Sequence, residues 1–237
     1  MNLLLLQPED LGADPNHVTL NDARAAHIRT VLRAATGDSL KIGLLNGLTG
    51  NATITAMSDN GLSLEIELHT PPLAKLPLTL LLALPRPKMA RRIIRAATEL
   101  GVAEIILLNS YRVEKSYWQS PLVSDETLHS AMLEGLEQAG DTVLPSLRRA
   151  TRFKPFVEDE LPSLLSDKLG LLAHPYAEQG PPQAVKQNCL LAIGPEGGFI
   201  PYECEKLIAA GMQSFSLGPR ILKTETAVST LIGRLFL

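Results

Sequence analysis

The chain has 237 residues, of which 45% are hydrophobic and 20% are charged, so it can form one or two domains with a buried core and is not a disordered protein. Its 22 basic and 25 acidic residues give a formal net charge of -3, which excludes a globally basic nucleic-acid-binding protein. Any contact with a nucleic acid must therefore use a local basic patch. Two cysteines, Cys189 and Cys204, are too few for a disulfide scaffold.

The N-terminal segment "MNLLLLQPEDLGAD" carries a short apolar run without a basic flank, and acidic residues follow it directly. It is therefore not interpreted as a signal peptide. No apolar run approaches the length of a membrane-spanning helix. No His-x-Glu or His-Glu-x-x-His motif indicates a metal site. We expect a reduced, cytoplasmic protein without membrane segments or bound metal.

Residues 20–37, "LNDARAAHIRTVLRAATG", are predicted to form a helix. Asn21 or Asp22 would cap its N-terminus, and Gly37 would follow its end. The segment that follows, residues 38–68, alternates short apolar stretches with Asn-Gly and Asp-Asn-Gly turns, which is typical of hairpins in a small β-barrel or sheet. The apolar face of the helix would consist of Ala25, Ile28, Val31 and Leu32.

The stretch "TPPLAKLP" at residues 70–77 contains three prolines, which stiffen the chain and end any preceding strand. The residue pattern also changes here, from hairpins to alternating strands and helices. We therefore predict two domains, residues 1–71 and residues 72–237.

The second domain is predicted to be a parallel α/β fold, because continuous apolar runs alternate with helical patterns. Strands are expected at residues 78–84, 102–108, 168–175, 189–198 and 213–218. Helices are expected at residues 87–100, with Gly101 just past the end, 124–139, 201–210 and 225–236. The core face of the helix at 87–100 would carry Met89, Ile93, Ala96 and Leu100.

Three strand ends carry the most distinctive residues, and in α/β sheets ligands bind beyond the carboxyl ends of strands. The glycine-rich "AIGPEGGFI" at residues 192–200 is neither a P-loop nor a dinucleotide fingerprint, so an ordinary tight turn is the alternative. His174 ends a third strand, in "LAHP". In "SLGPRILKTETA", residues 216–227, Thr224 would cap the last helix and Glu225 would lie in its first turn. Arg220 has no such explanation, because a cation opposes the helix dipole there.

A basic stripe lies at residues 86–95, "RPKMARRIIR", where cations recur at i, i+3, i+4 and i+7 with no acidic residue before Glu99. The pattern predicts phosphate binding, and a solvated charged face is the alternative. Smaller basic clusters occur at residues 27–33 and 147–154. The stripe consists of Lys88, Arg91, Arg92 and Arg95, with Arg86 just before it.

Taken together, "GPEGGF" and "SLGPRILKTETA" resemble the family that methylates N3 of a uridine in 16S ribosomal RNA, which belongs to the trefoil-knot (SPOUT) methyltransferases. The resemblance extends over nearly the whole chain, through "AHIRTVLR", "NGLTG", "LPRPKM" and "GLEQAGDTVLP". The sequence departs from the family at Ile200, where Ser or Thr is frequent, and at Asp141, where Arg is usual. The resemblance implies a trefoil-knotted parallel α/β (SPOUT) domain at residues 72–237 and a PUA-like RNA-binding β-barrel domain at residues 1–71.

The resemblance also implies a cofactor, a substrate and a homodimer. S-adenosyl-L-methionine would bind between three loops, with its adenine against Leu217, Ile221 and Leu222 and its ammonium near Glu196. The partners would be 16S ribosomal RNA in the small ribosomal subunit and a second copy of the chain. The implied cofactor-binding residues are Leu172, Ala173, His174, Ile193, Gly194, Pro195, Glu196, Gly197, Gly198, Leu217, Gly218, Ile221, Leu222 and Thr226.

For catalysis, we expect Arg220 to support the uracil or its phosphate, and Glu225 is a candidate base for the N3 proton. The RNA-binding residues would be Arg24, Arg29, Arg33, Arg86, Lys88, Arg91 and Arg92. Two alternatives stay open, a knot methyltransferase that acts on another RNA and a non-catalytic RNA-binding protein of ribosome assembly. A nucleotide-dependent dehydrogenase is disfavoured, because the dinucleotide fingerprint and its acidic strand end are missing.

Overall fold

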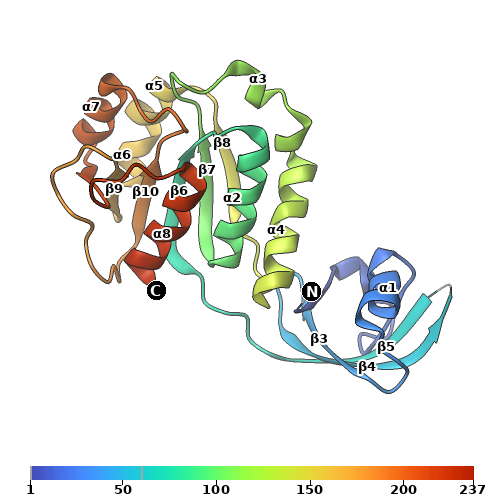
Figure 1. The fold of residues 1–237 in the computed structure, drawn as a ribbon. Coiled ribbons are helices and arrows are strands. Elements are labelled where there is room, and N and C mark those ends of the chain that lie inside the picture. The colour runs from blue at the N-terminus through green and yellow to red at the C-terminus, as the bar shows by residue number, and fades with distance from the viewer. Residues whose placement is uncertain (1, 60) are drawn as a thin grey trace. The chain divides into compact units, whose positions relative to one another are not determined.

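The computed structural model describes residues 2–59 and 61–237, and the chain forms two compact units (Figure 1). The first comprises the chain up to Ala74 together with Leu133–Leu144, and the second comprises Lys75–Met132 and Pro145–Leu237. The proline-rich stretch thus lies where the first unit passes into the second. The inclusion of residues 133–144 in the first unit has no counterpart in the sequence pattern.

The first unit contains a five-stranded sheet in the order β1-β3-β4-β5-β2. β1 pairs with β3 in parallel, and the other neighbouring strands are antiparallel. The predicted hairpins are confirmed, with the Asn-Gly turn between β3 and β4, but the two N-terminal strands were not predicted. The strands are β1 (Leu4–Leu6), β2 (His17–Leu20), β3 (Ser39–Leu44), β4 (Thr49–Ser58) and β5 (Gly61–Thr70).

The helix of the first unit begins as predicted and ends differently. In α1 (Ala23–His27), Asp22 accepts a hydrogen bond from the Arg24 N–H at 2.8 Å, which is the expected N-cap. A π-helical turn, η2 (Ile28–Leu32), follows. The helical segment ends at Arg33, which has a φ of 54°, and not at the predicted Gly37. A π-turn holds more residues per turn than an α-helix, so side chains beyond Ile28 rotate away from the core. The predicted core positions Val31 and Leu32 are wrong for this reason, with exposed fractions of 62% and 41%.

Arg24 links three parts of the first unit. Its guanidinium donates two hydrogen bonds of 2.7 Å to Asp10 of η1 (Pro8–Asp10), one of 2.7 Å to Asp22, and one of 2.9 Å to the Leu5 carbonyl oxygen. Burial raises the pKa of Asp10, but hydrogen bonds from Arg24 and from the Gln7 N–H outweigh burial and lower it overall. Arg24 therefore stabilises the fold, and its donors face protein acceptors rather than an RNA phosphate.

The second unit is built on a six-stranded sheet in the order β11-β9-β10-β6-β7-β8, and all neighbouring strands are parallel. Leu80, Ile105 and Leu191 are completely buried in its centre. The predicted strands are confirmed, while the arginine-containing β8 was not predicted. The strands are β6 (Leu76–Ala83), β7 (Val102–Leu108), β8 (Ser146–Ala150), β9 (Leu169–Ala173), β10 (Cys189–Ile193) and β11 (Gln213–Phe215).

The predicted helices are also present. The Ser124 hydroxyl accepts from the Thr127 N–H at 3.2 Å and caps α4 as predicted. α2 and α8 lie side by side on the near face of the sheet in Figure 1. The helical segments are α2 (Pro87–Glu99), α3 (Lys115–Trp118), η3 (Pro121–Val123), α4 (Asp125–Ala139), α5 (Phe153–Pro155), η4 (Phe156–Glu160), α6 (Leu161–Leu164), α7 (Pro201–Ala209) and α8 (Thr224–Phe236).

The buried face of α2 differs from the prediction by one position. Its spacing i, i+3, i+4, i+7 starts at Ala90 rather than Met89, because the helix packs against both the sheet and α8. Of the predicted positions only Ile93 is fully buried, and Met89, Ala96 and Leu100 are half-buried. The buried residues are Ala90, Ile93, Ile94, Ala97 and Thr98.

The connection between β9 and β10, residues 174–188, is bonded to the C-terminal segment at two places. The Ser216 N–H donates to the Gln179 carbonyl oxygen at 2.8 Å, and the Val185 N–H donates to the Leu235 carbonyl oxygen at 2.8 Å. These contacts fix the chain after β11 against that connection. Among the described residues, no helix has the length and apolar character needed to cross a membrane.

We predict that Arg24→Met lowers the free energy of unfolding at pH 7 by about 1–2 kcal/mol, because Asp10 and Asp22 lose a charged donor in a partly screened site. The folded-state pKa of Asp10 is lowered, so this stabilisation is complete above the ordinary pKa of the carboxyl group. It is lost as the pH falls through the folded-state pKa, and the difference between variant and wild type should shrink there. Urea unfolding at several pH values measures this, with Lys41→Met as the control. Equal stability at pH 7 would contradict the role of Arg24.

Candidate functional site

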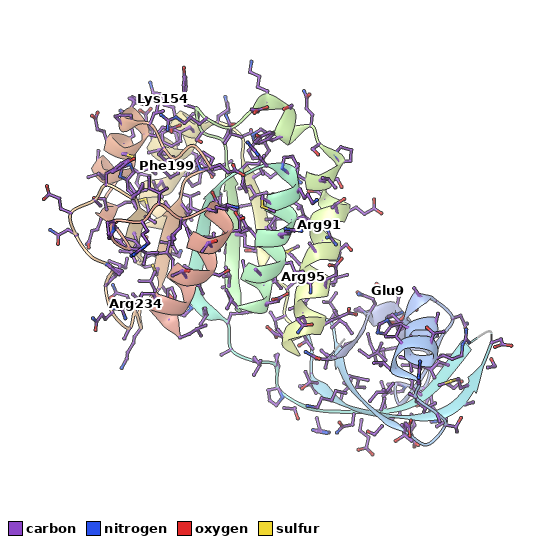
Figure 2. All side chains as sticks on the ribbon, in the orientation of Figure 1. Glu9, Arg91, Arg95, Lys154, Phe199 and Arg234 are labelled. Atoms are coloured by element: carbon purple, nitrogen blue, oxygen red, sulfur yellow. The ribbon has the colours of Figure 1, made fainter. Side chains whose placement is uncertain are left out.

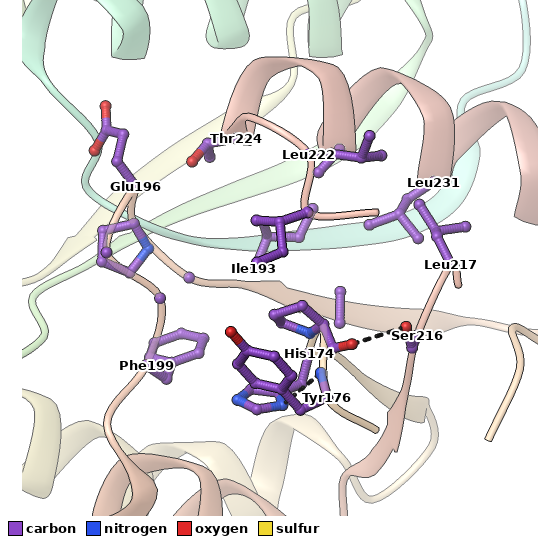
Figure 3. Close-up of a pocket in the computed structure, with 18 of the residues that line it drawn as sticks. His174, Tyr176, Ile193, Glu196, Phe199, Ser216, Leu217, Leu222, Thr224 and Leu231 are labelled. Atoms are coloured by element: carbon purple, nitrogen blue, oxygen red, sulfur yellow. Dashed lines mark hydrogen bonds between the residues drawn. The ribbon is translucent and has the colours of Figure 1, made fainter. Parts of the chain in front are cut away.

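Three strand ends surround a cavity of about 320 Å³ in the second unit (Figure 3). Because β9, β10 and β11 run parallel, the loops that follow Ala173, Ile193 and Phe215 leave the same edge of the sheet. The volume lies in the range typical of small-molecule sites. Figure 3 shows Leu217, Leu222 and Leu231 gathered on one side of the cavity, with Ile193 facing them.

The structure brings nearly all the predicted cofactor residues to this cavity. Leu172 is a buried residue of β9 and does not line it, and Thr226 lies on the exposed side of α8. Arg220 lines the cavity, whereas Glu225 does not. The predicted residues that line it are Ala173, His174, Ile193, Gly194, Pro195, Glu196, Gly197, Gly198, Leu217, Gly218, Ile221 and Leu222.

Sequence reasoning missed several lining residues. Most are neighbours of predicted ones in the same three loops, so wider loop boundaries would have included them. Arg112 comes from a fourth loop, the one after β7, and could have been found only by treating that strand end like the other three. The missed residues are Arg112, Pro175, Tyr176, Phe199, Phe215, Ser216, Thr224, Ala227 and Leu231.

The glycine-rich turn after β10 brings backbone close to backbone. The Gly198 N–H donates to the Pro195 carbonyl oxygen at 2.8 Å, and Gly198 has a φ of 73°, which favours glycine. A Cβ atom on Gly194 would lie 3.0 Å from the Phe199 nitrogen and 3.1 Å from Gly198 Cα. A side chain at Gly194 would press on the backbone of the turn, and one at Gly198 would be strained by the positive φ, so both glycines are needed for the shape of the turn.

Glu203 explains how α7 begins without Ser or Thr before Pro201. Its side chain has an exposed fraction of only 2%, and its Oε2 accepts from the Ile200 N–H at 3.0 Å. Its Oε1 accepts from the Tyr111 N–H at 2.7 Å. One buried carboxylate thus starts the helix and joins the glycine-rich turn to the loop after β7.

The segment of residues 216–222 is held by the hydroxyl of Ser216. This hydroxyl accepts from the Gly218 N–H at 3.1 Å and contacts the Pro175 carbonyl oxygen at 3.2 Å. The predicted cap at Thr224 is wrong, because Thr224 is the first helical residue and is buried against the cavity. The N-cap position belongs to Lys223, which makes no side-chain cap.

The charges around the cavity are unevenly paired. Glu196 is exposed, and its Oε1 accepts from the Arg86 backbone N–H at 2.9 Å. Burial lowers the pKa of His174, so its imidazole is neutral at pH 7. Arg220 is exposed, and within residues 2–59 and 61–237 it has no ion-pair partner. A positive charge is therefore available at the cavity.

The basic stripe of α2 is only partly available to a ligand. Arg95 Nε pairs with Glu99 at 2.9 Å, and Arg91 and Arg95 are half-buried along the helix (Figure 2). Lys88 and Arg92 are exposed, as is Arg86 just before the helix. In the part of the chain that the structure describes, His, Cys, Asp and Glu side chains form no group of three or more that could hold a metal ion.

The basic residues of the first unit also differ from one another. Arg24 is occupied by Asp10 and Asp22, as described above. Arg29 donates to the Ser58 carbonyl oxygen at 2.7 Å, and Arg33 is exposed at the end of η2. Asp141, in the position where the family resemblance led us to expect Arg, is buried and accepts from the Thr142 N–H at 2.7 Å.

Comparisons with known proteins agree with this architecture. Residues 72–235 match a family described as an RNA methyltransferase domain, and residues 20–67 match an RNA methyltransferase PUA domain. A protein of Treponema pallidum named ribosomal RNA small subunit methyltransferase E is 32% identical over 96% of this chain and 87% of its own length. A Synechocystis protein of the same name is 30% identical over 92% of this chain and 72% of its own length.

A solved structure shares the fold. The ribosomal RNA small subunit methyltransferase E of Neisseria gonorrhoeae, crystallised with S-adenosyl methionine, aligns with a TM-score of 0.79 and 23% identity, over 98% of this chain and 95% of that one. The predicted fold class is confirmed in its parallel α/β methyltransferase domain and its PUA-like β domain, while the trefoil knot stays what the family resemblance implies. The chain belongs to the RNA methyltransferase family that includes the proteins named ribosomal RNA small subunit methyltransferase E.

Proposed function

We propose that this RNA methyltransferase transfers a methyl group from S-adenosylmethionine to N3 of a uridine in 16S ribosomal RNA of the small ribosomal subunit. The observation that carries the proposal is the cavity at the ends of β9, β10 and β11, in a chain that matches the methyltransferase family over residues 72–235. Two relatives are named as small-subunit RNA methyltransferases, and a structural neighbour is crystallised with S-adenosyl methionine.

The residues around the cavity fit the proposed cofactor. Leu217, Ile221 and Leu222 form an apolar wall suited to an uncharged adenine ring. A Cβ atom on Gly198 would meet nothing within 4 Å, so the backbone of the turn is open there to close approach by a ligand. We propose that Glu196, exposed beside the turn, attracts the ammonium group of the methionine part. S-adenosylmethionine supplies an activated methyl group on a positively charged sulfur.

The chemistry at uracil requires loss of the weakly acidic N3 proton, and the developing negative charge spreads over O2 and O4. A fixed cation directed at these oxygens stabilises that charge. Arg220 lines the cavity and is the residue that we propose for this role. Glu225 does not line the cavity, so the geometry does not favour it as the proton acceptor.

The RNA would be bound through its phosphates by exposed cations. In the second unit these are Arg86, Lys88 and Arg92, and in the first unit it is Arg33. Arg29 is half-buried, and its Nη1 already donates to the Ser58 carbonyl oxygen, so it is a weaker candidate for this surface. We omit Arg24 from this surface because its donors are already bonded to Asp10, Asp22 and Leu5. The homodimer implied by the family resemblance and the cytoplasmic location expected from the sequence stay part of this proposal, and analytical ultracentrifugation tests the homodimer.

The proposed function predicts one specific methylated nucleotide. Purified small-subunit RNA, and separately intact subunits from a strain that lacks the gene, would be incubated with the protein and methyl-labelled S-adenosylmethionine. Digestion and mass spectrometry should find label in 3-methyluridine at a single position. Label in another nucleoside would point to a knot methyltransferase with a different substrate. Cofactor and RNA binding without any transfer would support the non-catalytic assembly protein instead.

Arg220→Ala should lower turnover on the RNA by about 10²-fold, the typical effect of removing one group that stabilises developing negative charge. The dissociation constant for S-adenosylmethionine should change by no more than about twofold, because the proposed target of Arg220 is the RNA. Lys223→Ala is the matched control, since Lys223 is an exposed cation of the same loop that does not line the cavity. Unchanged turnover in Arg220→Ala would remove Arg220 from the mechanism.

A further inference from the structure

Arg112 reaches the cavity from outside the three loops that form most of it. It follows β7, which is separated from β10 in the sheet by β6. Its side chain is exposed and lines the cavity together with the glycine-rich turn and Arg220. The cavity therefore has two arginines on its wall that come from different parts of the sequence.

The backbone that carries Arg112 is held from both sides. The Tyr111 N–H donates to the buried Glu203 carboxylate at 2.7 Å, and the Val113 N–H donates to the Ser110 carbonyl oxygen at 3.0 Å. Val113 itself is buried, with an exposed fraction of 7%. A residue on an ordinary surface loop lacks such anchors, so the position of Arg112 is determined before any ligand binds.

The side chain of Arg112 is also partly fixed. Its Nη1 donates to the Gly197 carbonyl oxygen, and a Cβ atom on Gly197 would lie 2.9 Å from Arg112 Cδ. The glycine thus leaves room for the stem of the arginine to lie on the turn. Arginine has five N–H donors, and Gly197 is the sole hydrogen-bond partner of this guanidinium within the described ranges 2–59 and 61–237.

The nearby carboxylates do not neutralise Arg112. Glu203 accepts from two backbone N–H groups, those of Tyr111 and Ile200. Glu196 accepts from the Arg86 backbone N–H. The guanidinium therefore keeps its charge and its free donors at the wall of the cavity, where a planar fork of N–H groups is suited to two oxygen atoms of one anion.

We propose that Arg112 is an anion-binding residue of the active site and that it binds an oxyanion of a bound substrate. Two sources carry this chemistry, the carboxylate of S-adenosylmethionine and a phosphate of the RNA. Glu203 acts as a positioning residue, because it fixes both the loop of Arg112 and the turn against which the arginine lies. The inference rests on the proposed function for the identity of the two substrates.

The test compares Arg112→Met with Arg234→Met in the full-length protein. The methionine keeps part of the stem on Gly197 and removes the charge. Arg234 is an exposed arginine of α8 that does not line the cavity (Figure 2). Calorimetry gives the dissociation constant for S-adenosylmethionine, and methylation assays give kcat and KM for the RNA. Arg112→Met should raise either the dissociation constant for S-adenosylmethionine or the KM for the RNA by about tenfold or more, the usual effect of losing a charged hydrogen bond. Arg234→Met should change neither constant.

The two sources of the anion give different results. If the carboxylate is the ligand, Arg112→Met weakens the binding of S-adenosylmethionine but not the binding of 5′-methylthioadenosine, which lacks the carboxylate. If a phosphate is the ligand, the KM for RNA rises and cofactor affinity stays unchanged. Changes of less than twofold in both constants would overturn the proposal. If the wild-type protein transfers no methyl group, only the proposed function fails. The role of Arg112 is then still tested by the binding of cofactor and RNA to the variants.

Two further variants separate positioning from loss of fold. Arg112→Lys keeps the charge without the planar fork, and it should restore part of the lost affinity. Glu203→Gln leaves one backbone N–H facing an amide nitrogen. It should therefore raise the same constant that Arg112→Met raises, either the dissociation constant for S-adenosylmethionine or the KM for the RNA. The double variant should be no worse than about the larger single effect, since Glu203 acts through Arg112. Additive losses, or a lower melting temperature with unchanged constants, would contradict the positioning role of Glu203.

Discussion

The parallel pairing of β9, β10 and β11 is the constraint on which the site depends. Ala173 lies opposite Ile193 of β10 and Phe215 of β11, so the three strands end at the same level of the sheet. Their following loops must therefore leave one edge together, although they are far apart in the sequence. The bond from the Ser216 N–H to the Gln179 carbonyl oxygen then ties the start of the C-terminal segment to the loop after β9 at that edge. The cavity is a consequence of this register.

A buried carboxylate is the second constraint, because it sets the distance between two loops that the sheet alone leaves free. Glu203 replaces the hydroxyl cap of α7 and also holds the loop after β7. A carboxylate with an exposed fraction of 2% is stable only where hydrogen bonds replace its water. Losing either N–H partner would leave it unsatisfied, so the two loops stay together. Site and fold are in this way stabilised by the same side chain.

The sequence was sufficient for the features that depend on local pattern, and insufficient where contacts between distant residues decide. Continuous apolar runs predicted β6, β7 and β10, and the strand-end rule led to Gly194 and Arg220 at one cavity. The π-turn of η2, which exposes Val31, leaves no mark in the apolar spacing. In the sequence, Arg24 cannot be distinguished from an RNA-binding arginine, because only the fold places it beside Asp10. Thr224 was wrongly predicted as a cap, and Arg112 was missed as a cavity residue, for the same reason. Packing against a distant loop determines their roles.

The loops at one edge of the parallel sheet are the part of the molecule that we expect to bind S-adenosylmethionine. Hydrogen exchange followed by mass spectrometry, with and without the cofactor, tests this expectation directly because it reports both binding and its location. We expect slower exchange in peptides covering residues 173–179, 194–199 and 216–223, with little change in residues 2–59. No protection by saturating cofactor, or protection confined to other parts of the chain, would contradict this expectation.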